Sequence, residues 1–353
     1  MNIVITVPSV KHGGGLSQYI YILANELVKA GNDVHVVTTH SSEEENGVAA
    51  ANFLDDILVE SSSSSNIIVR YAKTLYSIWR LQPDIIINNY NGVVQYLLPF
   101  LPQRSKFIHV IHGDTNDFFR IAAINAGRVT SWIAPSQAVA DHFNSYTDLK
   151  FAKKVTVIPH GIPECQASGV KNESFPQLTY VGVLYEHKGA HMLPDIIKGL
   201  KRKDLDFYFN IVGDGVLRNQ LEISLCNEIQ QGIVQFTGVV SSAEVYDLLS
   251  KTSIFVYPTQ LDSFGLVIAE AMMCGAVPVV SHLEGITDNL VEDGRNGFLI
   301  PVGDADAFVD KILSLIRNPE LLKTMRTAAK EIAERKFSLE VMRDNYMSLI
   351  NSL

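Results

Sequence analysis

Apolar and polar positions follow two patterns that recur along the chain. Short apolar, β-branched runs, first at Ile3–Val7 and Asp33–Thr38, predict buried strands, and the helical periodicity of Tyr19–Ala30 between them predicts a helix. Strand, helix and strand in this order indicate a βαβ unit, from which parallel sheets are built. The same alternation of apolar runs and helical periods predicts further strands at Asp84–Asn88, Lys106–Ile111, Ser131–Ala134 and Lys154–Ile158.

The pattern begins again after the polar stretch Glu164–Pro176. Five more runs predict strands: Leu178–Val181, Phe207–Val212, Val234–Thr237, Ile254–Tyr257 and Val277–Val280. A chain of 353 residues usually divides into two domains. We therefore expect an α/β protein of two doubly wound domains, 1–160 and 161–337, facing each other across a cleft at the carboxyl ends of their strands. The helix predicted over 338–353 is expected to pack back toward the first domain.

One region departs from this order. Ser41–Ser65 contains three consecutive glutamates and a run of five serines, which predicts a surface loop. The helix predicted after it, from about Asn66 to Leu81, has an apolar stripe that includes Ile68 and Leu75, with basic residues and Trp79 outside it. This pattern favours an ordinary amphipathic surface helix, with a helix lying on a membrane surface as the alternative.

Charge narrows the function classes. The formal net charge is −9, from 29 basic and 38 acidic residues, so nothing indicates a nucleic-acid partner. Before His160 the chain has 12 basic and 13 acidic residues, which leaves 17 and 25 for the rest. The first half can therefore approach an anionic surface more easily, and peripheral membrane contact through it remains an alternative.

The three cysteines, Cys165, Cys226 and Cys274, are odd in number and far apart, which predicts reduced thiols rather than a disulfide framework or a metal cluster. No apolar stretch is long enough to cross a bilayer, and the first apolar run is too short for a signal peptide. These features predict a cytoplasmic protein, peripheral at most at the inner membrane face.

Three glycine-containing turns before helices are candidates for binding chemistry. Gly13–Gly15 follow the first strand, and bare amides at a helix start suit a phosphate or a sugar hydroxyl, although such glycines often serve backbone geometry alone. Lys188 lies in a second turn and can reach a phosphate, although a solvated loop lysine fits equally well. In the third turn, the amides of Phe264, Gly265 and Leu266 are expected to point at an anion, with Asp262 before the helix and Glu270 inside it.

The spacing of Asp262 and Glu270 resembles the E-x7-E signature of family 4 retaining glycosyltransferases, which have the GT-B fold. Further landmarks resemble those of the family and occur in its order over nearly the whole chain. They are Gly14 and Gly15, the junction Ile158–Gly161, the turn with Gly182, Leu184, Lys188 and Gly189, the turn Gly213–Gly215, the strand Phe236–Val240 and the turn Glu292–Phe298.

The resemblance implies a role for each matching residue. Lys188 would hold the donor diphosphate, Glu270 the ribose hydroxyls and Asp262 hydroxyls of the transferred sugar. His112 would lie near the reacting sugar, whereas His109, three residues earlier in the same strand, is more typical of a structural residue. The other implied donor-binding residues are Gly14, Gly15, Gly213, Val240, Ser263, Phe264, Gly265 and Leu266.

The chain departs from the family pattern at three positions. Val183 stands where an arginine usually assists the diphosphate lysine, so another group must supply positive charge, with His187 and Arg218 as candidates. Asp262 replaces a glutamate and is one methylene shorter. His160 replaces an asparagine at the junction, and we assign it no catalytic role.

The resemblance implies transfer of a sugar, with retained configuration, from a nucleoside diphosphate sugar of UDP or GDP type. The acceptor would be a hydroxyl of a glycan, lipid-linked or small molecule in surface polysaccharide or lipopolysaccharide assembly. No metal site is expected, because neither a D-x-D-like pair nor a His or Cys ligand spacing is present, and no cofactor beyond the co-substrate is implied. A nucleotide-sugar epimerase, a sugar phosphorylase and a non-catalytic nucleotide-sugar-binding subunit remain alternatives.

Overall fold

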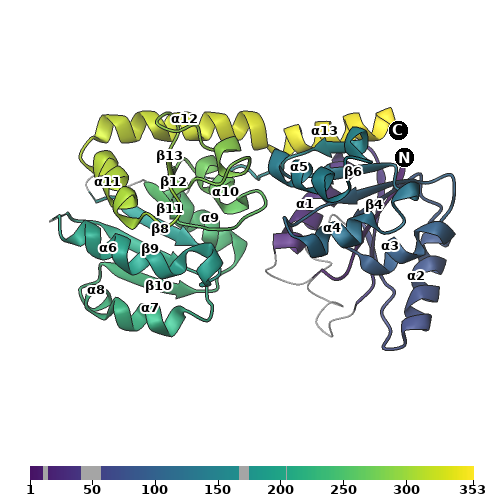
Figure 1. Ribbon diagram of the computed structural model, residues 1–353, viewed down its shortest axis with the longest axis horizontal. Helices are drawn as coiled ribbons and strands as arrows, with labels where there is room; N and C mark the ends of the chain where they lie inside the picture. Colours follow the sequence, from purple (N-terminus) through teal and green to yellow (C-terminus); the bar gives the residue numbers. More distant parts are fainter. Residues whose placement is uncertain (11–14, 41–56, 167–174, 204) are drawn as a thin grey trace. The chain divides into compact units, whose positions relative to one another are not determined.

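The computed structural model describes residues 1–10, 15–40, 57–166, 175–203 and 205–353 (Figure 1). The chain forms two compact units. Unit 1 contains Met1–Gly161 with Leu339–Leu353, and unit 2 contains Ile162–Ser338. The boundaries expected from the sequence lie within one residue of these.

Unit 1 is built on a seven-stranded sheet in the order β3-β2-β1-β4-β5-β6-β7, in which every pair of neighbours is parallel. Its strands are β1 (Asn2–Val7), β2 (Asp33–Thr38), β3 (Leu58–Ser61), β4 (Ile85–Asn89), β5 (Lys106–Val110), β6 (Ser131–Ala134) and β7 (Val155–Val157). Its helices are α1 (Gly15–Lys29), α2 (Ile67–Leu81), α3 (Gly92–Leu97), α4 (Asn116–Ala123), α5 (Gln137–Tyr146) and α13 (Leu339–Ser352).

The two faces of this sheet carry separate hydrophobic cores. Ile3 and Ile5 of β1 pack in a core shared with α1 and α13, whereas Val4 packs in a core with residues of α2 to α5. Successive side chains of a strand point to opposite faces, so burial of all three requires cover on both sides. The continuous apolar runs of the sequence have this origin.

Unit 2 contains a six-stranded parallel sheet in the order β10-β9-β8-β11-β12-β13. The strands are β8 (Gln177–Val181), β9 (Tyr208–Val212), β10 (Val234–Gly238), β11 (Ile254–Tyr257), β12 (Val277–Ser281) and β13 (Phe298–Ile300). The helices are α6 (Leu193–Lys201), α7 (Arg218–Ser224), α8 (Cys226–Gln230), α9 (Ser242–Lys251), α10 (Leu266–Met273), α11 (Ala305–Ile316) and α12 (Pro319–Phe337). The prediction of two doubly wound α/β domains is confirmed.

The predicted loop Ser41–Ser65 is wrong in its last part. Residues 41–56 lie outside the described residues, but Leu58–Ser61 form β3, which pairs with β2 at the edge of the sheet. An edge strand is only partly buried, so its sequence lacks the apolar signal of a central strand. The predicted helix start is right: the Asn66 side chain caps α2 by accepting hydrogen bonds from the amides of Ile68 and Val69.

Candidate functional site

The candidate donor residues of unit 2 gather at the carboxyl ends of β8, β9 and β11, which are neighbours in the sheet. Open parallel sheets bind ligands at this end of their strands. Each of the three strands is followed by a turn that holds one or more of the residues singled out above. Gly15 and His112 belong to unit 1.

The turn after β8 places Lys188 in a short 3-10 helix, Glu186–Lys188. Gly189 follows with φ 71°, and a Cβ there would lie 1.8 Å from the carbonyl oxygen of Pro258, so only glycine permits this approach to the end of β11. The Lys188 ammonium consequently lies beside the next turn, where it donates to the Leu261 carbonyl at 3.1 Å and to Asp262 Oδ2 at 2.9 Å.

The turn after β9 packs directly against the turn after β8. Gly213 has φ 125°, and a Cβ there would lie 2.0 Å from the carbonyl oxygen of Gly182. Arg218 lies at the start of α7, where its guanidinium binds Asp214 at 2.9 Å and Glu222 at 2.8 Å. Arg218 therefore lies at the same end of the sheet as Lys188 and could supply the positive charge that the missing arginine would bring. However, the carboxylates of Asp214 and Glu222 already offset the charge of Arg218. Val183 itself is 47% exposed.

The third turn differs from the expectation. The Phe264 and Gly265 amides were expected to bind a ligand anion, but Asp262 Oδ1 accepts from both, at 3.4 and 3.0 Å, and from the Ser263 amide at 2.8 Å. A short carboxylate three residues before the helix is well placed for this, as in an N-cap. The second oxygen of Asp262 accepts from Lys188 and, at 3.1 Å, from the Tyr257 hydroxyl. Leu266 is the first residue of α10.

The pKa values of Asp262 and Glu270 are shifted in opposite directions. Burial raises the pKa of Asp262, but the Lys188 ammonium and the turn amides outweigh this effect and hold the pKa below its usual range. Burial raises the pKa of Glu270 to about 7, although the neighbouring Tyr246 hydroxyl on α9 opposes the rise. A carboxylate that titrates near neutrality in a predicted ligand site is typical of functional positions.

Val240 lies just after β10, partly buried, beside the start of α9. Ser241 caps that helix through a capping box with Glu244. The cap fixes the end of β10, next to β9, so the site extends along the sheet edge from Val240 to Lys188.

In unit 1, His112 follows β5 and is bound by Asn89, the last residue of the neighbouring strand β4. His112 Nε2 lies 2.9 Å from Asn89 Oδ1, and Asn89 Nδ2 donates to the Ile87 carbonyl at 3.2 Å. The second bond fixes the amide orientation, so Oδ1 faces the ring and Nε2 carries the proton. The Nδ1 atom of His112 is then the hydrogen-bond acceptor.

His112 is kept neutral by its surroundings. Burial lowers the pKa of His112 well below its usual value, and the neighbouring His160 and His109 lower it further. The His160 ring stacks at 6.0 Å from that of His112, and the Tyr19 ring lies 5.1 Å away. A neutral imidazole accepts a hydrogen bond from a sugar hydroxyl, which an imidazolium cannot do.

His109 is structural, as its position inside the strand suggested. It is buried, and its Nδ1 lies 2.8 Å from Gln95 Oε1 in a network with Asn88. Gly15 begins α1, and a Cβ there would meet no atom of the described residues within 4 Å. Gly14 lies outside the described residues.

Three site residues were missed by the sequence prediction: Asn89, Tyr246 and Tyr257. Tyr257 and Asn89 each end a strand, so a search for polar side chains at strand ends would have found them. Tyr246 lies inside an ordinary amphipathic helix, and nothing in the sequence distinguishes it.

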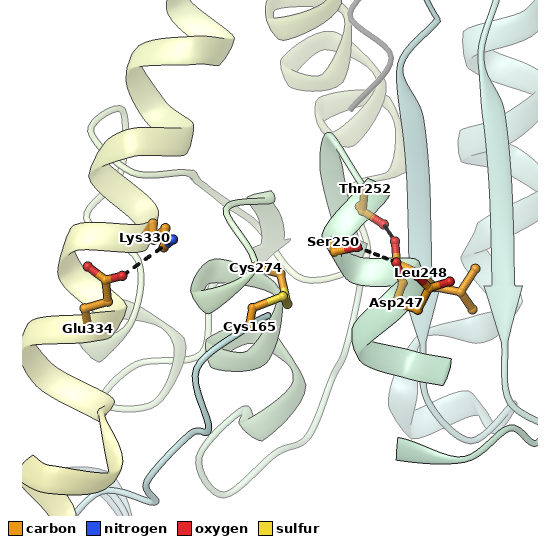
Figure 2. The surroundings of a disulfide bond; sticks show 8 residues. All are labelled: Cys165, Asp247, Leu248, Ser250, Thr252, Cys274, Lys330 and Glu334. Carbon is orange, nitrogen blue, oxygen red and sulfur yellow. Dashed lines mark hydrogen bonds and ion pairs between the residues drawn. A yellow bond between two sulfur atoms is a disulfide. The ribbon is translucent and has the colours of Figure 1, made fainter. Parts of the chain in front are cut away.

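The prediction of three reduced thiols is wrong for two of them. Cys165 and Cys274 form a disulfide, with their Cα atoms 5.0 Å apart, although 109 residues separate them in sequence. Figure 2 shows Cys165 on an extended segment that passes the end of α10, where Cys274 lies. Burial of Ile162 in the core of unit 2 brings this segment there, and the sequence gives no sign of that contact. Cys226 is a free, exposed thiol.

Among the described residues, no group of three or more His, Cys, Asp or Glu side chains is arranged to hold a metal ion. None of the described helices is both long and apolar enough to cross a membrane.

Two family models match the chain. The model described as glycosyl transferases group 1 matches residues 162–332, and that described as glycosyltransferase family 4 matches residues 13–164. The two matches together extend over most of units 1 and 2.

Among curated proteins, an uncharacterised glycosyltransferase of Methanocaldococcus jannaschii, MJ1178, is 30% identical over 63% of this chain and 59% of its own. WcaL of Salmonella typhimurium, a putative colanic acid biosynthesis glycosyltransferase, is 25% identical over 66% and 56%. The chain spans about half the length of the curated relatives it matches.

The fold has close counterparts among solved structures. HepE of Anabaena, crystallised with UDP, superposes with a TM-score of 0.82 at 20% identity, over 100% of both chains. The expected GT-B fold, with its two Rossmann-like domains, is confirmed by such likenesses.

Proposed function

Since the chain belongs to the family 4, group 1 glycosyltransferases, we propose that it transfers a sugar from a nucleoside diphosphate sugar to a hydroxyl of a glycan or lipid-linked acceptor. One observation carries the proposal. Lys188 binds the turn that precedes α10, after the carboxyl end of β11, and Glu270 lies within that helix, so the segment that follows β11 combines a bound cation, a helix start and a carboxylate.

Each part of a nucleotide sugar has a partner in this arrangement. Lys188 neutralises the diphosphate, with the glycine turn at Gly213 allowing close approach of backbone. The Glu270 carboxylate accepts from the ribose hydroxyls, and Asp262 lies between Lys188 and the start of α10, toward the transferred sugar. For His112, the family resemblance alone supports the proposal that its ring accepts from a sugar hydroxyl.

We propose that the reaction proceeds with retention and without a metal ion. The bond between the anomeric carbon and the diphosphate oxygen breaks, and the acceptor oxygen bonds to the same face of that carbon. The acceptor proton passes to the departing phosphate oxygen, so the products are a glycoside and a nucleoside diphosphate. The absence of the usual arginine at Val183 places more of the leaving-group stabilisation on Lys188 and on backbone amides.

The relative named for colanic acid biosynthesis supports an acceptor in surface polysaccharide assembly. Such acceptors are often lipid-linked, and the outward face of α2 fits a membrane surface. Ile68 and Tyr76 on this helix are 74% and 69% exposed, and Trp79 is 47% exposed. These residues recur at helical spacing on one face, with Lys73 and Arg80 beside them.

Charge supports an anionic lipid surface as the partner of this face. Between Ser62 and Gly113 the chain has five basic residues and one acidic residue, although the whole protein carries −9. An exposed apolar and aromatic stripe flanked by lysine and arginine is typical of helices that lie in the headgroup region. Peripheral contact through α2 would bring unit 1 to a lipid-linked acceptor.

Sedimentation with vesicles tests this contact. We expect the protein to bind vesicles of phosphatidylcholine with 30% phosphatidylglycerol, as an example, more than vesicles of phosphatidylcholine alone. An Ile68→Gln, Tyr76→Gln variant should lose binding, whereas the matched control Ile223→Gln, at a 76% exposed position on unit 2, should keep it. Equal binding by all three proteins would refute the role of α2.

Calorimetric titration tests the catalytic proposal. The protein is titrated with UDP, GDP and ADP and their common sugars, first with a chelator and then with divalent cations. We expect one nucleotide class to bind without metal, and Lys188→Ala to weaken it at least about tenfold, as loss of a charge-assisted contact does. Lys251→Ala, which removes a surface lysine paired with Asp247, is the matched control.

The alternatives give different outcomes. Turnover that requires free phosphate would indicate a phosphorylase, and interconversion of the nucleotide sugar without an acceptor would indicate an epimerase. Binding without turnover over a broad acceptor panel would indicate a non-catalytic subunit. Failure of every nucleotide to bind would refute the proposal itself.

A further inference from the structure

The carboxylate of Asp262 has a hydrogen-bond donor at every side. Oδ1 accepts from the amides of Ser263, Phe264 and Gly265, and Oδ2 accepts from Lys188 and Tyr257. The side chains of Lys188 and Asp262 are only 20% and 13% exposed. The chain's own carboxylate thus lies at the amino end of α10 and on the lysine, where an anionic ligand would otherwise bind.

This pairing limits what Lys188 can offer to a ligand. The ammonium has three hydrogens, of which one is directed to Asp262 Oδ2 and one to the Leu261 carbonyl. A diphosphate bound to the third would lie within a few ångströms of the Asp262 carboxylate. Two anions at such a distance, in a partly buried site, repel each other strongly. A stable complex is therefore easier to form if Lys188 leaves Asp262.

We propose that Asp262 and the donor diphosphate compete for Lys188, so that donor binding transfers the ammonium from Asp262 Oδ2 to the diphosphate and leaves Oδ2 to accept a sugar hydroxyl. This inference rests on the proposed function and deepens it. It makes Asp262 a positioning residue for Lys188 before donor binds, and a sugar contact afterwards.

The geometry allows this exchange without rearrangement of the backbone. Oδ1 stays fixed by three amides of the same turn, so the carboxylate keeps its place when Lys188 moves. Tyr257 keeps its proton, because burial and the nearby Asp262 raise its pKa well above the usual value, and it continues to donate to Oδ2. Only the long, flexible side chain of Lys188 has to change partner.

The exchange links recognition of the two ends of the donor. Oδ2 becomes available to the sugar only after the diphosphate has drawn Lys188 away. A free nucleoside diphosphate has to break the ion pair without gaining a sugar contact in return, whereas a nucleotide sugar gains one. Asp262 therefore opposes binding of the product diphosphate more than binding of the donor, which favours product release.

The test is a double-mutant cycle with Asp262→Asn and Lys188→Ala, read by calorimetry with the nucleoside diphosphate that the wild type binds among UDP, GDP and ADP. Asparagine keeps the acceptor oxygen of the cap, so the turn at α10 should persist. The corresponding nucleoside, without phosphates, is the matched control ligand. Melting temperatures of all four proteins verify that each is folded.

We expect Asp262→Asn to bind the diphosphate about tenfold more tightly, because the competing charge is gone, and to bind the nucleoside as the wild type does. The gain should vanish in the Lys188→Ala background. In turnover, Asp262→Asn should lower kcat while KM for the donor does not rise, because the sugar contact is weakened and the competition removed. If Asp262 had only a structural role, Asp262→Asn would lower the melting temperature and would not lower kcat while leaving KM unchanged.

Two distinguishable outcomes would contradict the proposed exchange of Lys188. If the wild type binds the diphosphate and Asp262→Asn binds it equally or less tightly, the exchange is refuted and the proposed function stands. If neither protein binds any nucleoside diphosphate, the proposed function fails, and the exchange with it.

Discussion

Glu270→Gln should raise the stability of the fold at pH 8 and weaken nucleotide binding, so the substitution affects the two properties in opposite directions. Glu270 on α10 has a pKa of about 7 because of burial, compared with an ordinary glutamate value of 4.5. A carboxyl whose pKa rises on folding binds its proton more tightly in the folded state. Its contribution to stability is therefore fully present below pH 4.5 and is lost as the pH rises through 7.

The magnitude follows from the two pKa values. They differ by about 2.5, and each pKa unit corresponds to about 1.4 kcal/mol, so ionised Glu270 costs the fold at most about 3.5 kcal/mol above pH 7. Its side chain is not wholly shielded from solvent, which reduces the cost to about 1–3 kcal/mol. Glutamine has no charge to bury. Glu270→Gln should thus be more stable than the wild type at pH 8 by this amount, and nearly equal to it at pH 5.

The same substitution should weaken nucleotide binding. A carboxylate accepts two hydroxyl hydrogen bonds where an amide offers one acceptor, so affinity should fall about tenfold or more at pH 8. In the wild type, affinity should fall about tenfold between pH 8 and pH 6, because protonation of a group with a pKa of about 7 removes the acceptor.

Urea unfolding at pH 5 and pH 8, with nucleotide titrations at pH 6 and pH 8, measures both effects. Glu331→Gln, on the exposed side of α12, is the matched control and should change neither. A stability difference independent of pH would refute the burial of an ionised Glu270. Wild-type nucleotide affinity in Glu270→Gln would remove this residue from the donor site.

Three further predictions concern the framework around the site. Asn89→Asp places a carboxylate 2.9 Å from His112 Nε2 and should raise the pKa of the imidazole. The acidic limb of the pH–rate profile should therefore move up by about one to three pH units. An unchanged profile would contradict the role of this hydrogen bond. Gly213→Ala should destabilise unit 2 by a few kcal/mol in urea unfolding, because its Cβ meets Gly182. Gly232→Ala, also at positive φ but with no atom of the described residues within 4 Å, should cost about 1 kcal/mol, and equal costs would exclude the close approach as the cause. Cys165→Ser should lower the free energy of unfolding by about 2–4 kcal/mol, because the disulfide closes a loop of 109 residues. A reductant should lower the stability of the wild type to that of the variant and leave the variant unchanged. A wild type whose stability is insensitive to reductant would contradict the disulfide.

The sequence predicted most of the sheets because their strands are buried on both faces and therefore read as continuous apolar runs. Ile3–Ile5 of β1 and Val277–Val280 of β12 are entirely buried in this way. Edge strands are different. β3 has four residues, none of them fully buried, so its sequence carries little pattern, and β13 has only three residues, too few to form a recognisable run.

The candidate site was predictable where a residue and its function belong to one turn. Lys188, Gly213 and Asp262 lie in turns after strands; their position in a turn marks Lys188 and Asp262, and the family resemblance marks Gly213. Partners brought from elsewhere in the fold were not predictable. The sequence gives no sign that Asp262 binds Lys188, 74 positions away, or that Asn89 binds His112.

The outward face of α2 shows a further limit of periodicity. The sequence places Ile68 and Leu75 on one apolar stripe, but the structure exposes Ile68, buries Leu75 only in part and turns Thr74 and Ile78 toward the core. Two apolar faces on one helix cannot be assigned to core and surface from spacing alone. The exposed one is informative because an ordinary surface helix would be polar there.

The most direct test of the central claim is a proton NMR time course of the protein with its nucleotide sugar and a hydroxyl acceptor, in the presence of a chelator. The account predicts that nucleoside diphosphate and glycoside appear together, that the anomeric coupling of the product matches that of the donor, and that Lys188→Ala abolishes both signals. Inverted configuration, turnover only with added metal, or no turnover of any donor that binds would contradict it.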